Sequence, residues 1–93
     1  MKAVTQNRCR RVEFHLQAEP GSKVFVAGSF NDWDPTSLPL LPASDGRVYR
    51  ATVLLPPGRH DYKFVVNGVW HVDPACPDWV PNALGTLNSV VSV

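Results

Sequence analysis

Short stretches of this chain either alternate polar with apolar residues or run through apolar, β-branched residues. Residues 11–16 (RVEFHL) alternate with the two-residue period of a strand that buries one face. Residues 23–27 (KVFVA) are the apolar, β-branched kind of run that buried strands contain. No stretch has a sustained helical period. The chain therefore predicts six strands, at residues 11–16, 23–27, 48–55, 59–66, 69–73 and 84–93.

Turn and breaker residues separate these strands. Residues 30–46 are rich in Pro, Asp, Ser and Asn, and predict one long loop with Leu38, Leu40 and Leu41 as apolar anchors. Residues 73–82 hold three prolines and predict an irregular segment. Six short strands divided in this way favour an all-β fold, a sandwich of two antiparallel sheets.

One hairpin allows the two faces of a sheet to be assigned. Asn67-Gly68 between two apolar runs is a strong signal for a two-residue type I′ turn, which requires positive φ at both positions. The turn sets Val65 opposite Trp70, and directly opposed residues point to the same side. Lys63 lies on that side too, because side chains alternate along a strand. Since a buried Lys63 would need a partner, we expect Lys63 and Trp70 on the outer face, about 7–8 Å apart. The core face then carries Tyr62 and Phe64.

A second tryptophan, Trp33, lies among turn residues in GSFNDWDP. We expect Gly28 to let the strand leave the sheet, Asn31 and Asp32 to set the bend through side-chain hydrogen bonds, and Phe30 to point inward. The Trp33 ring either folds back onto the core or is held out to meet a ligand, and Trp70 with Lys63 could by itself be a cross-strand pair that shields the sheet. Two exposed indoles in so short a chain favour a contact surface. Flat indoles with a cation and amides suit a sugar ring, which has an apolar face of C–H bonds and an equator of hydroxyls.

Charge and size limit the remaining classes. The chain has 93 residues, enough for one small domain over residues 1–93, with a flexible N-terminal arm over about residues 1–9. Nine Lys and Arg against eight Asp and Glu leave a net charge of +1, which argues against nucleic acid as the partner. No apolar run approaches the roughly 18 residues of a membrane span, and the first residues lack the apolar centre of a signal peptide. We expect no membrane contact and a cytoplasmic location.

The two cysteines, Cys9 and Cys76, are too few for a disulfide framework, although a single bridge between them stays open. His71, Asp73 and Cys76 lie close in sequence, but no CxxC or HxxxH pair accompanies them, so we expect no metal site.

These segments together resemble family 48 carbohydrate-binding modules, the glycogen-binding type found in the β subunit of AMP-activated protein kinase and in glycogen branching and debranching enzymes. The matching pieces are VFVAGSFNDW, LPPGRHDYKFVVNGVW, DP at Asp73-Pro74 and LGTLN, in that order. The resemblance implies an immunoglobulin-like β-sandwich. It implies α-1,4-linked glucans as ligands, such as glycogen, starch, maltodextrin or cyclodextrin, and a glycogen-metabolising enzyme as a candidate protein partner.

The resemblance also implies a role for six residues. Trp33 and Trp70 would stack on glucose rings, and Lys63 would hydrogen-bond to hydroxyls. Leu84 would insert into the curve of a helical glucan, and Thr86 and Asn88 would contact further hydroxyls. Trp79, in PDWVPN, departs from the family's sequence, and we expect it to cap the core rather than to extend the sugar contact.

Two other classes of function share parts of this pattern. A glycosidase needs two carboxyl groups about 5–9.5 Å apart across a cleft, whereas most Asp residues here fall at turns and strand ends, where Asp is common. A protein-interaction module could use the same outer aromatic face. We therefore expect a non-catalytic glucan-binding protein without a cofactor, with a protein-interaction module as the alternative.

Overall fold

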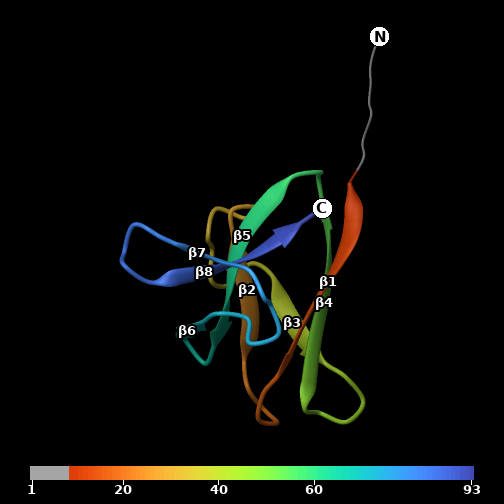
Figure 1. The fold of residues 1–93 in the computed structure, drawn as a ribbon. Coiled ribbons are helices and arrows are strands. Elements are labelled where there is room, and N and C mark those ends of the chain that lie inside the picture. The colour runs from red at the N-terminus through yellow and green to blue at the C-terminus, as the bar shows by residue number, and fades with distance from the viewer. Residues whose placement is uncertain (1–8) are drawn as a thin grey trace.

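The computed structural model describes residues 9–93 as an all-β protein (Figure 1). The predicted arm of about residues 1–9 lies outside the described residues except for Cys9. Residues 9–93 contain no helix, and hence none long and apolar enough to cross a membrane. The strands are β1 (Arg10–Gln17), β2 (Val24–Gly28), β3 (Pro39–Pro42), β4 (Val48–Leu55), β5 (Arg59–Val66), β6 (Val69–His71), β7 (Trp79–Pro81) and β8 (Leu87–Ser92).

The strands form one curled antiparallel sheet. Hydrogen bonds join them in the order β1-β4-β3-β2-β5-β8-β7, and β6 pairs with β5. Phe14 of β1 packs against Tyr62 and Phe64 of β5, with ring centroids 4.8 and 6.5 Å apart, although β1 and β5 are not neighbours in that order. The prediction of an all-β antiparallel fold is thus confirmed. The immunoglobulin-like sandwich stays a prediction.

Two strands, β3 and β7, lie in segments that we predicted to be irregular. β3 pairs with β2 and with β4 through two residues on each side, and it begins and ends with proline. β7 pairs with β8 and ends with Pro81. Proline has no N–H to donate and is depleted in strands, so composition alone predicts a loop in both places.

The core lies on the inner face of the curled sheet. Of the three predicted loop anchors, Leu40 is buried and Leu38 packs partly against the core, but Leu41 is 66% exposed, so its prediction as an anchor was wrong. Phe30 stacks on Phe14 at 5.7 Å, which confirms that Phe30 points inward. The core cluster consists of Phe14, Leu16, Val24, Val26, Leu40, Tyr49, Leu55, Tyr62 and Phe64, and Ala27 and Val65 are buried outside it.

The β5–β6 hairpin has the predicted register. Phe64 lies opposite His71, Val65 opposite Trp70 and Val66 opposite Val69. Asn67 and Gly68 have φ values of 49° and 84°, as a type I′ turn requires. Phe64 is fully buried, and the other side of β5 carries Lys63 away from the core.

A buried polar cluster joins β5, β8 and the segment after β6. The Tyr62 hydroxyl donates to Asp73 Oδ2 at 2.7 Å, and the Asp73 backbone N–H donates to Ser89 Oγ at 2.8 Å. Burial and then the bond to Asp73 raise the pKa of the Tyr62 phenol above its usual value. The cluster holds the start of the segment that leads into β7 and the loop before β8.

Candidate functional site

One pocket of about 530 Å³ lies on the outer face of the sheet beside β5, β6 and β8. All six residues that the sequence suggested for ligand binding line this pocket, together with two neighbours that it did not suggest. None of the eight carries a carboxyl, imidazole or thiol group. The lining residues are Trp33, Lys63, Trp70, Asn82, Ala83, Leu84, Thr86 and Asn88.

Trp33 enters the pocket from the turn that follows β2. Its backbone has a φ of 57°, and that of the preceding Asp32 is 56°. A left-handed backbone is uncommon for a bulky residue and costs about 1–3 kcal/mol, which the surrounding contacts must offset. Trp33 is half-buried, whereas we expected an exposed indole. Asp32 makes no side-chain hydrogen bond within the described residues, so its predicted role in the bend is limited to its backbone.

Asn31 holds this turn in place. Its Oδ1 accepts from the Gly28 backbone N–H at 2.9 Å, and its Nδ2 donates to Val26 O at 3.2 Å and to Ser37 Oγ at 3.0 Å. The Trp33 backbone N–H donates to Gly28 O at 2.9 Å. The predicted role of Asn31 is therefore confirmed, and the amide fixes the backbone from which the indole extends.

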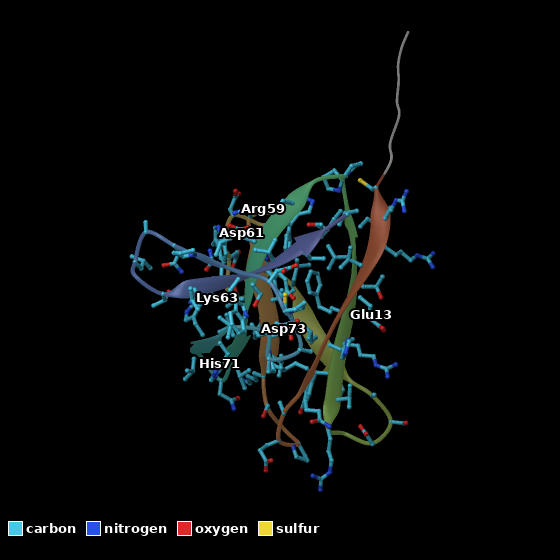
Figure 2. All side chains as sticks on the ribbon, in the orientation of Figure 1. Glu13, Arg59, Asp61, Lys63, His71 and Asp73 are labelled. Carbon is cyan, nitrogen blue, oxygen red and sulfur yellow. The ribbon has the colours of Figure 1, made fainter. Side chains whose placement is uncertain are left out.

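Trp70 and Lys63 come to the pocket from the β5–β6 hairpin. Trp70 is 42% exposed on the outer face. The ion pair that the described residues contain, Arg59 with Asp61 at 3.2 Å, does not involve Lys63. Lys63 Nζ instead donates to Thr86 Oγ1 at 3.0 Å, so its charge is not neutralised by a carboxylate. Figure 2 shows Lys63 on the side where β6 and β8 lie, opposite the side that carries Glu13.

Leu84 lies at the tip of the loop between β7 and β8, which projects from the body of the molecule (Figure 1). Leu84 is 88% exposed, the highest value among the large apolar residues of positions 9–93. Gly85 follows with a φ of 81°, a conformation that glycine adopts without strain. An apolar side chain held so far into solvent gains nothing from the core and is available to a ligand.

Thr86 and Asn88 lie beneath this loop at the start of β8. Asn88 is only 7% exposed, so a ligand could contact only the small part of this residue that faces the pocket. Asn82, which the sequence analysis missed, hydrogen-bonds to both residues. The sequence signal for Asn82 was its position three residues before Gly85. Asn and Gly are common in turns, so this spacing did not identify Asn82 as a site residue.

Trp79 does not cap the core, which corrects our expectation. It is 54% exposed, does not belong to the residues packed on the core, and does not line the pocket. Cys76 is a free thiol within hydrogen-bond distance of the carbonyl oxygens of Asp78 and Val90. Within residues 9–93 no group of His, Cys, Asp or Glu side chains is placed to hold a metal ion.

The pocket thus combines two indoles, one exposed aliphatic side chain, an ammonium group, a hydroxyl and amides. Apolar faces can exclude water from the C–H face of a ligand, and the polar groups can hydrogen-bond at its edge. Acid–base hydrolysis of a glycoside would need paired carboxyl groups, which the lining does not supply.

Comparison with known proteins identifies a family. A family model described as the glycogen recognition site of AMP-activated protein kinase matches residues 11–93. The chain is 43% identical over 76 residues to the 5'-AMP-activated protein kinase subunit beta-2 of Homo sapiens, which covers 82% of this chain and 26% of that protein. It is 42% identical over 73 residues to the subunit beta-1 of Sus scrofa, which covers 78% of this chain and 56% of that protein. The chain spans 27% of the length of the beta-2 subunit of Mus musculus.

Proposed function

Because this chain belongs to the family described as the glycogen recognition site of AMP-activated protein kinase, we propose that it is a single non-catalytic module that binds glycogen. The ligands would extend to other α-1,4-linked glucans, such as starch, maltodextrin and cyclodextrin. The observation that carries the proposal is the convergence of Trp33, Lys63, Trp70 and Leu84 on one pocket from three separate segments of the chain.

Each residue has a distinct role in this proposal. Trp33 and Trp70 stack on glucose rings, where apolar burial of about 1.5–3 kcal/mol for each side chain is available. Leu84 inserts into the curve of the glucan. Lys63 and Thr86 hydrogen-bond to hydroxyls at the edge of the ring. Asn88 contributes from the floor of the pocket.

The pocket is shallow and its polar contacts are few, so we expect a weak affinity for a single site. A dissociation constant in the micromolar to millimolar range corresponds to about 4–8 kcal/mol. Glycogen offers many chain ends to many modules, and multivalency would raise the apparent affinity further.

The family's name concerns a protein kinase, and the two relatives described above are subunits of that kinase. A glycogen-metabolising or regulatory enzyme that this module brings to its polymer is therefore our proposed protein partner. A protein-interaction module that uses the pocket itself for a partner remains the alternative function. The cytoplasmic location stays a prediction.

We also propose that the scaffold is an immunoglobulin-like sandwich. What supports it is the packing of Phe14 from β1 on Tyr62 from β5, two strands that share no hydrogen bonds. Such contacts are expected if the β1–β4 half of the sheet packs face to face with the half that holds β2, β5 and β8, as the two layers of a sandwich do.

Calorimetric titration with β-cyclodextrin and co-sedimentation with glycogen test the glucan proposal. Trp33→Ala and Trp70→Ala should each weaken β-cyclodextrin binding by about tenfold or more, because each removes one stacking face. Neither indole belongs to the buried core, so circular dichroism should show the wild-type fold in both variants.

Trp79→Ala is the matched control, because Trp79 is an exposed tryptophan that does not line the pocket. This variant should bind as the wild type does. Wild-type protein that binds neither β-cyclodextrin nor glycogen would overturn the proposal and favour the protein-interaction alternative. Undiminished binding by the Trp33→Ala and Trp70→Ala variants would show that the ligand sits elsewhere.

A further inference from the structure

Asn82 makes four side-chain hydrogen bonds in the wall of the pocket. Its Oδ1 accepts from the backbone N–H groups of Leu84 at 3.0 Å and of Thr86 at 3.1 Å. Its Nδ2 donates to Thr86 Oγ1 at 2.7 Å and to Asn88 Oδ1 at 2.9 Å. Both lone pairs of the oxygen and both protons of the nitrogen are therefore used.

The chemistry of these partners leaves only one orientation for each amide. Backbone N–H groups can only donate, so the atom of Asn82 that faces Leu84 and Thr86 must be its oxygen. Its nitrogen then faces Asn88, and a donor requires an acceptor there, so Asn88 must turn Oδ1 toward it. The Nδ2 group of Asn88, a residue that is 7% exposed, is left without an acceptor within the described residues.

The same reasoning sets the direction of the Thr86 hydroxyl. Its oxygen receives two donors, Asn82 Nδ2 at 2.7 Å and Lys63 Nζ at 3.0 Å, and both of these groups can only donate. Both lone pairs of Oγ1 are thus engaged. The hydroxyl proton has no acceptor among the residues that the structure describes, and Thr86 lines the pocket.

We propose that Asn82 is a positioning residue that sets both the shape and the hydrogen-bond polarity of the glucan site. One end of its amide holds the loop that presents Leu84. The other end fills the remaining acceptor site of Thr86 Oγ1 and draws Asn88 Oδ1 toward residue 82, so that Lys63, Thr86 and Asn88 turn donors toward the ligand. The ligand then accepts hydrogen bonds from these groups through its oxygen atoms, such as those of neighbouring sugar hydroxyls. This inference rests on the proposed function.

Asn82→Asp separates the two roles. An aspartate of the same shape keeps an oxygen for the N–H groups of Leu84 and Thr86, but its second oxygen cannot donate. Thr86 and Asn88 must then turn their own donors toward residue 82, away from the ligand. We expect β-cyclodextrin affinity to fall about tenfold, which is the loss of one to two neutral hydrogen bonds, while amide exchange at Leu84 and Thr86 stays slow. Asn82→Ala should lose both the affinity and the slow exchange.

Gln17→Glu, an exposed amide-to-acid change on β1, is the control for the added negative charge and should bind as the wild type does. Thr86→Val tests the polarity without a substitution at position 82, although it also removes the acceptor of one Asn82 Nδ2 hydrogen bond. It should weaken binding several-fold, whereas Thr86→Ser, which keeps the hydroxyl, should restore it.

The results separate this inference from the proposed function. If the wild type binds β-cyclodextrin and Asn82→Asp binds within twofold of it, the polarity role is wrong and the proposed function stands. An Asn82→Asp variant that loses affinity together with slow exchange at Leu84 and Thr86 would also overturn it, because the loop would have moved. If the wild type binds no glucan, both proposals fail.

Discussion

Gly28, at the end of β2, lies where the fold leaves no room for a side chain. A Cβ atom at this position would lie 2.5 Å from Phe30 Cε2 and 2.6 Å from the carbonyl oxygen of Asp61. The sequence suggested that a glycine here lets the strand leave the sheet. The structure supplies the reason, which is the close approach of the neighbouring backbone and of the ring that anchors the Trp33 turn.

Gly28→Ala should therefore destabilise the protein. We expect a loss of about 1–3 kcal/mol, the usual cost of forcing an extra carbon into a packed site. Urea unfolding measured by circular dichroism gives this value directly. An alanine variant as stable as the wild type would mean that Phe30 and the backbone of β5 move aside without cost.

The turn after β2 is the element that depends most on one side chain. Asn31 spans it by accepting from Gly28 and donating to Val26 and Ser37, and so supports the left-handed backbone of Trp33. That Asn31 would bond to the nearby backbone could be predicted, because an Asn side chain in a turn can hydrogen-bond to the backbone close by. Its partners Val26 and Ser37 could not, because they depend on the path of the whole turn.

Asn31→Ala should release Trp33 from its fixed position. We expect glucan affinity to fall about three- to tenfold, since a mobile indole must be ordered again on binding. Ser37→Ala removes only one of the partners of Asn31 and serves as a graded control with a smaller effect. Calorimetric titration with β-cyclodextrin measures both. If Asn31→Ala binds β-cyclodextrin with the affinity of the wild type, the turn around Trp33 keeps its conformation without the Asn31 side chain.

In the molecule as a whole, one buried polar cluster connects the central strand to the segment that carries Leu84. Tyr62 of β5 donates to Asp73, and Asp73 binds Ser89 of β8 through its backbone. The sequence placed Tyr62 in the core but gave no hint of its partner, because the two residues meet only when β6 folds back along β5.

Tyr62→Phe should destabilise the protein by about 1–3 kcal/mol, because it leaves a buried oxygen of Asp73 without its donor. The pH dependence gives a second test. The raised pKa of the Tyr62 phenol means that the unfolded chain loses this proton first, so stability falls as pH rises above about 10. The fall should be shallower in Tyr62→Phe. Urea unfolding at pH 7 to 11 measures both effects, and identical pH slopes would contradict this role of Tyr62.

The pattern of residues along the chain was sufficient to predict six of the strands and the half of the binding face that Lys63 and Trp70 form. The Asn67-Gly68 turn sets the register of β5 and β6, so Lys63 and Trp70 could be placed together from spacing alone. These features involve neighbours in sequence, where backbone geometry leaves few choices.

The other half of the site depends on contacts between distant residues. Lys63 and Thr86 are 23 positions apart, and their hydrogen bond exists because β8 pairs with β5 and the loop before it is held by Asn82. The exposure of Trp79 and the short strand β3 likewise follow from how the sheet curls and pairs. The periodicity of the sequence cannot predict such contacts, because they contribute free energy only when segments that are distant in sequence meet in the folded protein.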